Sequence, residues 1–439
     1  MSSFDHKYAH LRLPLKDIKI ATDNFADENI VRRDGSGNEY KGQLVLSSGQ
    51  LIDILARRLD PRWGQGIKEF QTEIMMLSNL NHQNIVSIVG FCDEDEEKII
   101  INKFEAKGNL YEYLSDPVTL PWTQRLQICL GIARALSYIH YDNQRSFSVI
   151  HRDVCSFKIL LGDNWEAKLS GFELSIMQPA AKRQGLILDY PCGTHGYCDP
   201  AYIASETVNH KSDVYSFGVV LFEVMTGRKA HNPDNRDLKF SAKTAKSHFE
   251  NGNLNDIIHP DLQKQMDQGS LKKFSEAAYY CVNDQRSQRP NLDQLIFALD
   301  QALKLQLAHE ESLSLKEPST LADEGTLSNY WKGKKLEHLR IGFDAIKSAT
   351  NNFDETCLIG KGGYGWVYKA ELEHFDPYAT KGDRESEVPR RHSIVAIKYI
   401  IPREDAQGEQ GFTAEIETLS CCKHPNIVSL LGFCHEHPH

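Results

Sequence analysis

The chain repeats itself, and this repeat restricts its fold more than any other feature. The segment ATDNFADENIVRRDGSGNEYKGQL (residues 21–44) aligns without a gap with ATNNFDETCLIGKGGYGWVYKAEL (residues 349–372). Further along, FQTEIMMLSNLNHQNIVSIVGFC (70–92) matches FTAEIETLSCCKHPNIVSLLGFC (412–434) at 13 of 23 positions. Identity over such long segments indicates a duplicated domain. The second copy stops at His439, soon after the matched segments.

A chain of 439 residues is long enough for two domains that each bury a core. We expect the first domain at residues 1–305. A polar segment with Gly and Pro and few apolar residues, 306–335, is typical of a linker. The second domain is then expected at residues 336–439.

Composition narrows the class of protein. The chain is 41% hydrophobic and 25% charged, which argues against disorder, and its net charge of −10 gives no reason to expect nucleic acid or direct membrane binding. Neither a signal peptide nor an apolar run of membrane-spanning length occurs, and Ser2 excludes N-myristoylation. Scattered cysteines without zinc spacing predict reduced thiols, so a cytoplasmic protein is expected.

The apolar pattern changes along each copy. The runs VLSSGQLIDILARRL (45–59) and HSIVAIKYII (392–401) are typical of strands between turns. Apolar residues at helical spacing predict helices over 70–80 and 125–140, and KSDVYSFGVVLFEVMTG predicts a helix that ends at Gly227. A β-rich lobe followed by a helical lobe is an α+β plan with a cleft between the lobes.

Several motifs together carry a resemblance. They are the ATDNF and ATNNF leads, HxNIVSxxGFC in both copies, and VIHRD, GTHGYCDPAY and KSDVYSFGVVLFEV in the first. In this combination the chain resembles the plant receptor-like, Pelle-type serine/threonine protein kinases over nearly all of its length. The resemblance implies a bilobal kinase fold for the first copy and a partial second kinase lobe rich in strands.

The resemblance implies an ATP site in the second copy. Phosphoryl transfer uses a glycine loop over the phosphates, a strand lysine and a helix glutamate that holds this lysine. The second copy supplies all three parts, and its expected nucleotide-binding residues are Gly360, Gly362, Gly365, Val367, Lys398 and Glu415.

The catalytic part of such a site is missing from the second copy, because neither a base nor metal-holding residues follow before His439. We therefore expect any ATP binding to be weak and to reside in this copy. The polar insertion EHFDPYATKGDRESEVPRRHS (373–393) is interpreted as a mobile loop.

The first copy has both lobes but a changed glycine loop and strand lysine. Aligned with the second copy, it has Arg32 and Asp34 in place of two glycines, and Glu39 in place of Val367. Arg57 stands where the second copy has Lys398, and its planar guanidinium group cannot occupy the same site as the compact ammonium group of a lysine. Glu73 keeps its place and is expected to pair with Arg57.

The residues that hold metal in the resembling family are absent from the first copy. Lys158 stands at the family's Asn, and Gly171 stands at the Asp of its DFG triplet, in GFE. Magnesium is therefore not expected in this copy, and no metal-binding residue is assigned. Cys155 replaces the lysine that helps position the transferred phosphate.

Asp153 of the HRD triplet remains at the position of the catalytic base. We interpret it as a residual base position, inactive here, and favour a structural role in the turn. Asp213 fits the buried anchor of this loop. The resemblance implies that Arg289 would pair with a glutamate before the SDVYSFG helix, but Ala201 occupies that position, so a looser activation segment is expected.

Three functions stay open on the sequence. The favoured one is a pseudokinase that binds other protein kinases or receptor complexes, with any membrane association supplied by those partners. The rival is an ATP-dependent serine/threonine kinase that acts by an unusual route or in a longer chain. The third is a truncated product whose second domain is unstable because its sheet has an open edge.

Overall fold

The computed structural model divides the chain into two compact units, Met1–Glu317 and Pro318–His439. Each unit is considered by itself below. The structure describes residues 3–34, 37–46, 48–60, 66–230, 240–314, 339–362, 365–375, 390–399, 412, 415–416, 419–420 and 428–435.

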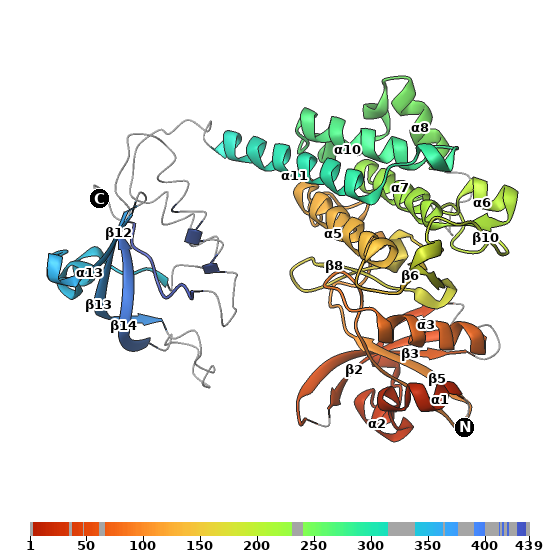
Figure 1. Ribbon diagram of the computed structural model, residues 1–439, viewed down its shortest axis with the longest axis horizontal. Coiled ribbons are helices and arrows are strands. Elements are labelled where there is room, and N and C mark those ends of the chain that lie inside the picture. Colours follow the sequence, from red (N-terminus) through yellow and green to blue (C-terminus); the bar gives the residue numbers. More distant parts are fainter. Residues whose placement is uncertain are drawn as a thin grey trace. The chain divides into compact units, whose positions relative to one another are not determined.

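The first unit begins with a lobe that consists mainly of one sheet (Figure 1). Its elements in chain order are α1 (Ser3–Lys7), α2 (Leu15–Ala21), β1 (Ile30–Asp34), β2 (Gly37–Val45), β3 (Leu51–Leu59), α3 (Ile67–Asn79), β4 (Ile88–Glu94) and β5 (Glu97–Lys103). The strands form an antiparallel sheet in the order β1-β2-β3-β5-β4. This order places β3 in the centre, where four successive side chains, Ile54 to Arg57, are buried on the two faces.

A helix covers each face of this sheet. Along β5, Ile99 and Ile101 pack with Ile18 of α2, whereas Ile100 packs with Phe70 of α3. The alternation follows from the two-residue period of a strand. Arg57 of β3 lies opposite Ile100 in the register and so belongs to the face that α3 covers.

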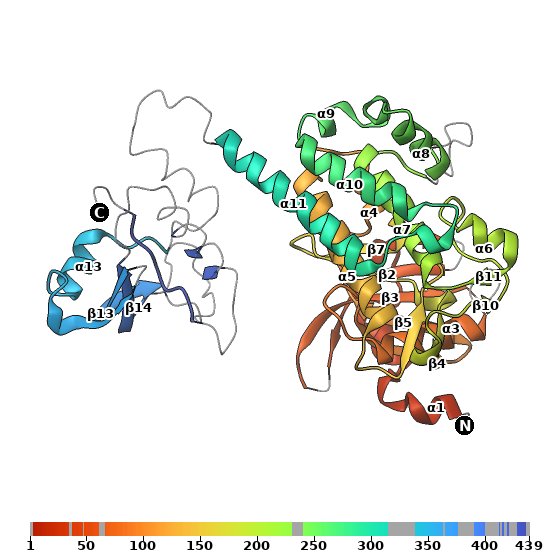
Figure 2. The ribbon, with the colours of Figure 1, turned by 45° about the horizontal axis from the view of Figure 1, so that its top comes forward.

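The second lobe of the first unit is mainly helical. Its elements are α4 (Leu110–Tyr113), α5 (Trp122–Tyr141), β6 (Phe147–Ile150), η3 (Ser156–Lys158), β7 (Ile159–Leu161), β8 (Ala167–Leu169), η4 (Phe172–Leu174), β9 (Ile176–Pro179), η5 (Ala180–Lys182), β10 (Ile187–Leu188), α6 (Pro200–Ser205), β11 (Thr207–Val208), α7 (His210–Thr226), α8 (Ala242–Glu250), η6 (Leu254–Ile257), α9 (Pro260–Gln263), α10 (Gln268–Cys281), η7 (Arg286–Gln288) and α11 (Leu292–Ser314). Figure 2 shows α7 among α5, α10 and α11.

Helix α7 is the centre of this lobe, and its residues from Ser212 to Thr226 are all buried. Asn209 caps its first turn by accepting from the Lys211 amide at 3.0 Å. The helix ends at Gly227, whose φ of 72° suits glycine. The predicted helix and its end are confirmed, and with them the α+β, two-lobed fold.

The two copies of the ATxNF lead form the same tight turn. In the first copy, Asp23, Asn24 and Phe25 all have positive φ, and in the second Asn351, Asn352 and Phe353 do. A threonine holds each turn: Thr22 donates to Ile18 and accepts from the Phe25 amide, and Thr350 makes the same pair of bonds with Ile346 and Phe353. Repeated sequence therefore gives repeated local structure.

The second unit has one short helix and a three-stranded antiparallel sheet among its described residues. These elements are α13 (Phe343–Ala349), η9 (Glu355–Cys357), β12 (Leu358–Gly362), β13 (Gly365–Phe375) and β14 (Arg390–Tyr399), with strand order β12-β13-β14. A small core of Leu339, Ile416 and Phe433 lies elsewhere in the unit.

The interpretation of 373–393 as a loop was wrong at both ends. Glu373 pairs with His392 and Phe375 with Arg390, so the hairpin of β13 and β14 extends into the insertion. His374 is buried there and bonds to Ser393 at 2.6 Å. Polar composition concealed these strands, because a hairpin that projects from a sheet does not need an apolar face. The rest of the insertion, 376–389, lies outside the described residues.

The expected linker start at residue 306 was also wrong, because α11 continues to Ser314. Gln306 is fully buried; its amide donates to the Gln265 carbonyl at 2.7 Å and its oxygen accepts from the Asp267 amide at 2.8 Å. These bonds fix the start of α10. Composition indicated a linker because a buried glutamine that is satisfied by backbone groups resembles an exposed one in sequence.

Replacing Gln306 with Ala should therefore destabilise the first unit. The change leaves the partly buried amide of Asp267 and carbonyl of Gln265 without their partner, and we expect a loss of about 1–3 kcal/mol in unfolding free energy. Hydrogen exchange of α10 and α11 across a denaturant series measures it in the full chain. Lys304→Ala, on an exposed turn of the same helix, is the control and should cost less than about 0.5 kcal/mol. Equal effects would contradict a structural role for Gln306.

Candidate functional site

The two units place different residues at three matched positions of their sheets. In the second unit, Gly360 lies opposite Val367, which lies opposite Lys398. The same cross-strand register in the first unit aligns Arg32, Glu39 and Arg57. Arg32 donates to Glu39 at 2.7 Å, so an ion pair stands where the second unit has a glycine and a valine.

Arg57 and Glu73 form a buried ion pair between β3 and α3, as expected. Burial opposes the charge of Arg57, but Glu73 and Glu173 more than offset this and raise its pKa. Burial, against the opposing effect of Arg57, raises the pKa of Glu73 to about 7. The guanidinium is therefore charged in the folded chain, and it holds α3 against the sheet.

Glu173 brings the charges of the two lobes together. This residue of η4 accepts from Lys158 Nζ at 2.7 Å, and its Oε1 lies 4.0 Å from Nη1 of Arg57. Burial opposes its ionisation, but the cations of Lys158 and Arg57 hold the pKa of Glu173 at about 2. Sequence reasoning noticed GFE only for its lost aspartate. The signal that was missed is that the triplet gains an acid next to a newly acquired lysine.

Gly171 adopts the left-handed conformation that glycine tolerates best, with a φ of 80°. A Cβ atom at this position would lie 2.4 Å from Cδ of Lys158. The side chain of Lys158 therefore fills the space that a side chain at residue 171 would need.

Asp153 is hydrogen-bonded to Thr194, which lies between β10 and α6. Its Oδ1 accepts from the amide of Thr194 at 2.6 Å and from the Thr194 hydroxyl at 2.7 Å, and the side chain is buried. Burial raises the pKa of Asp153 against the opposing charge of Lys158. Cys155 is buried beside Thr194, with its Sγ 3.5 Å from the hydroxyl. Thr194 was not singled out from the sequence.

Asp213 anchors the turn that carries Asp153. Its carboxylate accepts from the amides of His151 and Arg152, each at 2.8 Å, and contacts Nε2 of His140 at 2.7 Å. These bonds hold Arg152 at a φ of 73°. The expected anchoring role of Asp213 is thus supported by its contacts. Phe172 is fully buried against His151.

Magnesium and ATP, which the resemblance implies for such a cleft, do not fit the residues of the first unit. A lysine ammonium and a glycine stand at the two metal-holding positions, and the ammonium is bound to Glu173. Glu39 places a carboxylate where the second unit has the apolar Val367. Because like charges repel strongly in a buried site, a divalent cation beside Lys158 is disfavoured.

The second unit places five of its expected nucleotide residues on the adjacent strands β12, β13 and β14, and the sixth, Glu415, is helical. Lys398 Nζ donates to Glu415 at 2.6 Å, and both side chains are about two-fifths exposed. Gly362 pairs with Gly365 at the end of the hairpin, and the φ of 144° at Gly365 favours glycine. The strand lysine expected from the sequence is therefore paired with the expected glutamate in this unit, and Val367, whose register partner is Gly360, lies opposite this lysine.

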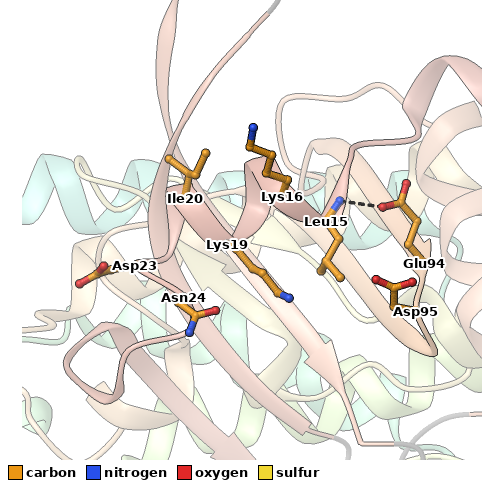
Figure 3. Close-up of a pocket in the computed structure, with 8 residues that line it drawn as sticks. All are labelled: Leu15, Lys16, Lys19, Ile20, Asp23, Asn24, Glu94 and Asp95. Atoms are coloured by element: carbon orange, nitrogen blue, oxygen red, sulfur yellow. Dashed lines mark hydrogen bonds between the residues drawn. The ribbon is translucent and has the colours of Figure 1, made fainter.

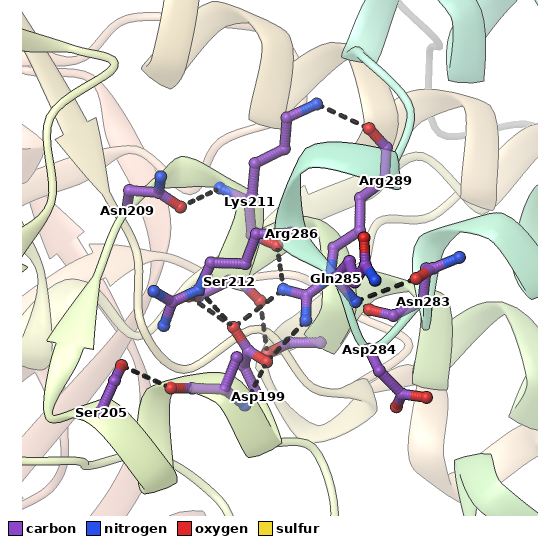
Figure 4. Close-up of polar contacts among 12 residues, drawn as sticks. Asp199, Ser205, Asn209, Lys211, Ser212, Asn283, Asp284, Gln285, Arg286 and Arg289 are labelled. Carbon is purple, nitrogen blue, oxygen red and sulfur yellow. Dashed lines mark hydrogen bonds and ion pairs between the residues drawn. The ribbon is translucent and has the colours of Figure 1, made fainter.

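The activation segment is held more firmly than expected at Asp199, just before α6. Arg289 does not lack a partner: it donates to Asp199 through two nitrogens at 2.7 and 2.8 Å, and both side chains are fully buried (Figure 4). Arg286 and Ser212 also bond to Asp199. The expectation of a loose segment was therefore wrong. An acid two residues before Ala201 takes the arginine, a substitution that alignment of single positions does not show.

Two surface cavities of the first unit are lined by residues other than Asp153, Lys158 and Glu173. One, of about 730 Å³, is open and lies beside α2 and the turn between β4 and β5, where Leu15 donates to Glu94 (Figure 3). The other, of about 680 Å³, lies beside α5 and α11.

Comparison with known proteins identifies the family. A family model described as protein tyrosine and serine/threonine kinase matches residues 35–299 and 353–439. The chain therefore belongs to the protein kinase family.

Relatives of the chain include plant receptor-like protein kinases from Arabidopsis thaliana. FERONIA is 39% identical over 299 residues, which make up 67% of this chain and 33% of FERONIA. ANXUR1 is 38% identical over 298 residues, 67% of this chain and 34% of ANXUR1. A putative receptor-like protein kinase is 35% identical over 373 residues, 82% of this chain and 42% of that protein.

The chain spans less than half the length of these relatives. Across the described part of the chain, no helix is both long and apolar enough to span a membrane.

Replacing Asp199 with Asn should destabilise the first unit at neutral pH by about 3 kcal/mol, because it leaves a buried arginine unpaired. Burial opposes ionisation, but the bonds and charge of Arg289 lower the pKa of Asp199 below its usual value. A lowered pKa gives stability that is present above pH 4 and is lost as the pH falls through the folded-state pKa. The difference between wild type and variant should therefore shrink toward pH 3.

Denaturant unfolding of the full chain at pH 7 and pH 3 measures this effect. Asp261→Asn, which removes an exposed pair with Lys264, is the matched control and should leave stability nearly unchanged. A loss that is the same at both pH values would show that the charge of Asp199 is not what stabilises the segment.

Proposed function

We propose that the first unit is a pseudokinase and acts by binding other proteins in plant receptor-like kinase signalling. The observation that carries the proposal is the 2.7 Å bond from Lys158 to Glu173, at the place where the family holds its metal. Phosphoryl transfer needs cations that neutralise the phosphates, and a lysine already bound to a glutamate does not supply them.

The retained Asp153 does not restore catalysis by itself. A base acts only on a substrate whose phosphate donor is positioned in line with it, and that positioning is the work of the missing parts. Asp153 is also bound to Thr194 through both the amide and the hydroxyl. We therefore assign it a structural role, in which it ties the catalytic turn to the following segment.

Protein binding fits what the first unit keeps. Asp213 and Asp199 keep their hydrogen bonds, and the buried helix α7 is intact. The unit therefore keeps a kinase-like surface for binding other proteins while, in this proposal, it does not transfer phosphate. The partners proposed are other protein kinases or receptor complexes, because the relatives are named receptor-like kinases. A cytoplasmic location, with recruitment to the plasma membrane through partners, follows as part of this proposal.

The chain is proposed to be a tandem of two kinase-like domains, of which the second keeps the nucleotide site. Its Lys398–Glu415 pair and its glycines carry this part of the proposal. The rival function is an ATP-dependent serine/threonine kinase, and the same pair is the observation that favours it. Activity would then require catalytic residues that the described part of the second unit does not contain.

A phosphotransfer assay separates the two functions. The full chain, incubated with radiolabelled ATP, magnesium and a generic serine/threonine substrate, should transfer no more phosphate than its Asp153→Asn variant. Activity that Asp153→Asn abolishes would overturn the pseudokinase proposal. Activity that survives Asp153→Asn but is lost with Lys398→Ala would place catalysis in the second unit.

Nucleotide binding should depend on the second unit alone. We expect Lys398→Ala to remove weak binding of a fluorescent ATP analogue to the full chain, because Lys398 supplies the phosphate-binding charge. Arg57→Ala is the matched change in the first unit and should leave the affinity unchanged. The reverse pattern, with binding lost in Arg57→Ala only, would move the site to the first unit.

A further inference from the structure

Lys158 makes two contacts in the first unit that are unusual for a lysine, an ion pair in a largely buried site and a close packing contact with a glycine. Its ammonium donates to Glu173 at 2.7 Å, and its side chain is four-fifths buried. Its methylene chain lies against Gly171 of the GFE triplet. Both contacts are with the triplet that replaces DFG, so the lysine and this triplet depend on each other.

The contact with Gly171 is a steric exclusion. A Cβ on residue 171 would lie 2.4 Å from Cδ, 2.9 Å from Cε and 3.0 Å from Cγ of Lys158. Real Cβ atoms essentially never approach another atom within 3 Å, so a Cβ at residue 171 would force the side chain of Lys158 out of this position. Lys158 can keep its present side-chain conformation only with glycine at residue 171.

The contact with Glu173 connects the two lobes. From Glu173, the charges continue to Arg57 of β3 at 4.0 Å and then to Glu73 of α3. Two cations alternate with two carboxylates in this series: Lys158, Glu173, Arg57 and Glu73. Arg57 and Glu73 belong to the sheet lobe, whereas Lys158 belongs to the helical lobe. Within the described residues, Glu173 Oε2 has no hydrogen-bond partner, so the carboxylate relies on the cations for its charge balance.

We propose that Lys158 is a tethered cation that takes over the lobe-joining role of a metal ion in this cleft, with Gly171 as the residue that makes room for it. The inference deepens the proposed function, because it explains how a first unit without catalysis keeps its lobes together. Since the cation is covalently part of the chain, joining the lobes costs no ligand binding and does not vary with magnesium or nucleotide concentration.

The charge part of the proposal predicts a local loss of protection. In the full chain, Lys158→Met keeps the length of the side chain but removes its charge and leaves Glu173 buried without its nearest cation. Amide exchange of α3 and of residues 171–175, measured by mass spectrometry, should rise by roughly tenfold or more, because a buried carboxylate without its partner favours local opening. Exchange in α10, which does not contact the cluster, should stay unchanged.

The matched control is Lys168→Met, which removes another lysine of the same lobe that bonds to a backbone carbonyl. It should leave α3 and residues 171–175 as protected as in the wild type. Unchanged protection of α3 in Lys158→Met would overturn the lobe-joining role. So would wild-type protection of residues 171–175 that increases when magnesium replaces EDTA, because a metal would then be acting in the cleft.

The steric part is tested by a double-mutant cycle of Gly171→Ala and Lys158→Ala. Gly171→Ala should lower the melting temperature of the first unit much more in the wild type than in the Lys158→Ala background, where the clashing atoms are gone. The strain of alanine at a positive φ is present in both backgrounds and cancels. Equal losses in the two backgrounds would overturn the coupling between the residues.

These outcomes are distinguishable from failure of the proposed function. If phosphotransfer by the first unit were found while Lys158→Met still exposed α3, the tethered cation would stand and the pseudokinase assignment would fall. If phosphotransfer were absent and Lys158→Met had no effect on protection, the reverse would hold.

Discussion

The carboxylate of Glu173 is the point at which the charges of the two lobes meet, and the arrangement of the cleft depends on it. It lies between the Lys158 ammonium and the Arg57 guanidinium, and Arg57 in turn holds Glu73 and therefore α3. A buried carboxylate is tolerated when cations or hydrogen-bond donors compensate its charge, and for Glu173 the compensation comes from Lys158 and Arg57. The positions of η4, β3 and α3 are consequently coupled, because a shift of any one of them would separate buried charges.

The residues that build the fold differ from those that would perform the chemistry. Asp213 binds the amides of the catalytic turn, and Asp199 binds Arg289 beneath the following segment. Both act through contacts that need neither nucleotide nor metal. Under the proposed function, the changes at Lys158 and Gly171 would remove metal binding without disturbing these anchors. This separation explains how a kinase fold can persist after its catalytic residues have changed.

The sequence predicted those features that depend on periodicity or on one residue at a known position. It predicted α7 and its end at Gly227, the two-lobed α+β fold and the Arg57–Glu73 pair. It failed where the outcome depends on which groups meet in space. Gln306 looked like linker but is bonded to backbone in the core, and Arg289 seemed unpaired although Asp199 reaches it. The steric link between Lys158 and Gly171 also needs coordinates, because neither residue is unusual alone.

The most direct test of the tethered cation is an experimental structure of the full chain, determined at high resolution after incubation with magnesium and a non-hydrolysable ATP analogue. The account predicts that Lys158 Nζ stays within hydrogen-bonding distance of Glu173, with no metal between Asp153 and Glu173. A magnesium ion bound in that space, with Lys158 displaced toward solvent and the analogue's phosphates beside Arg57, would contradict it.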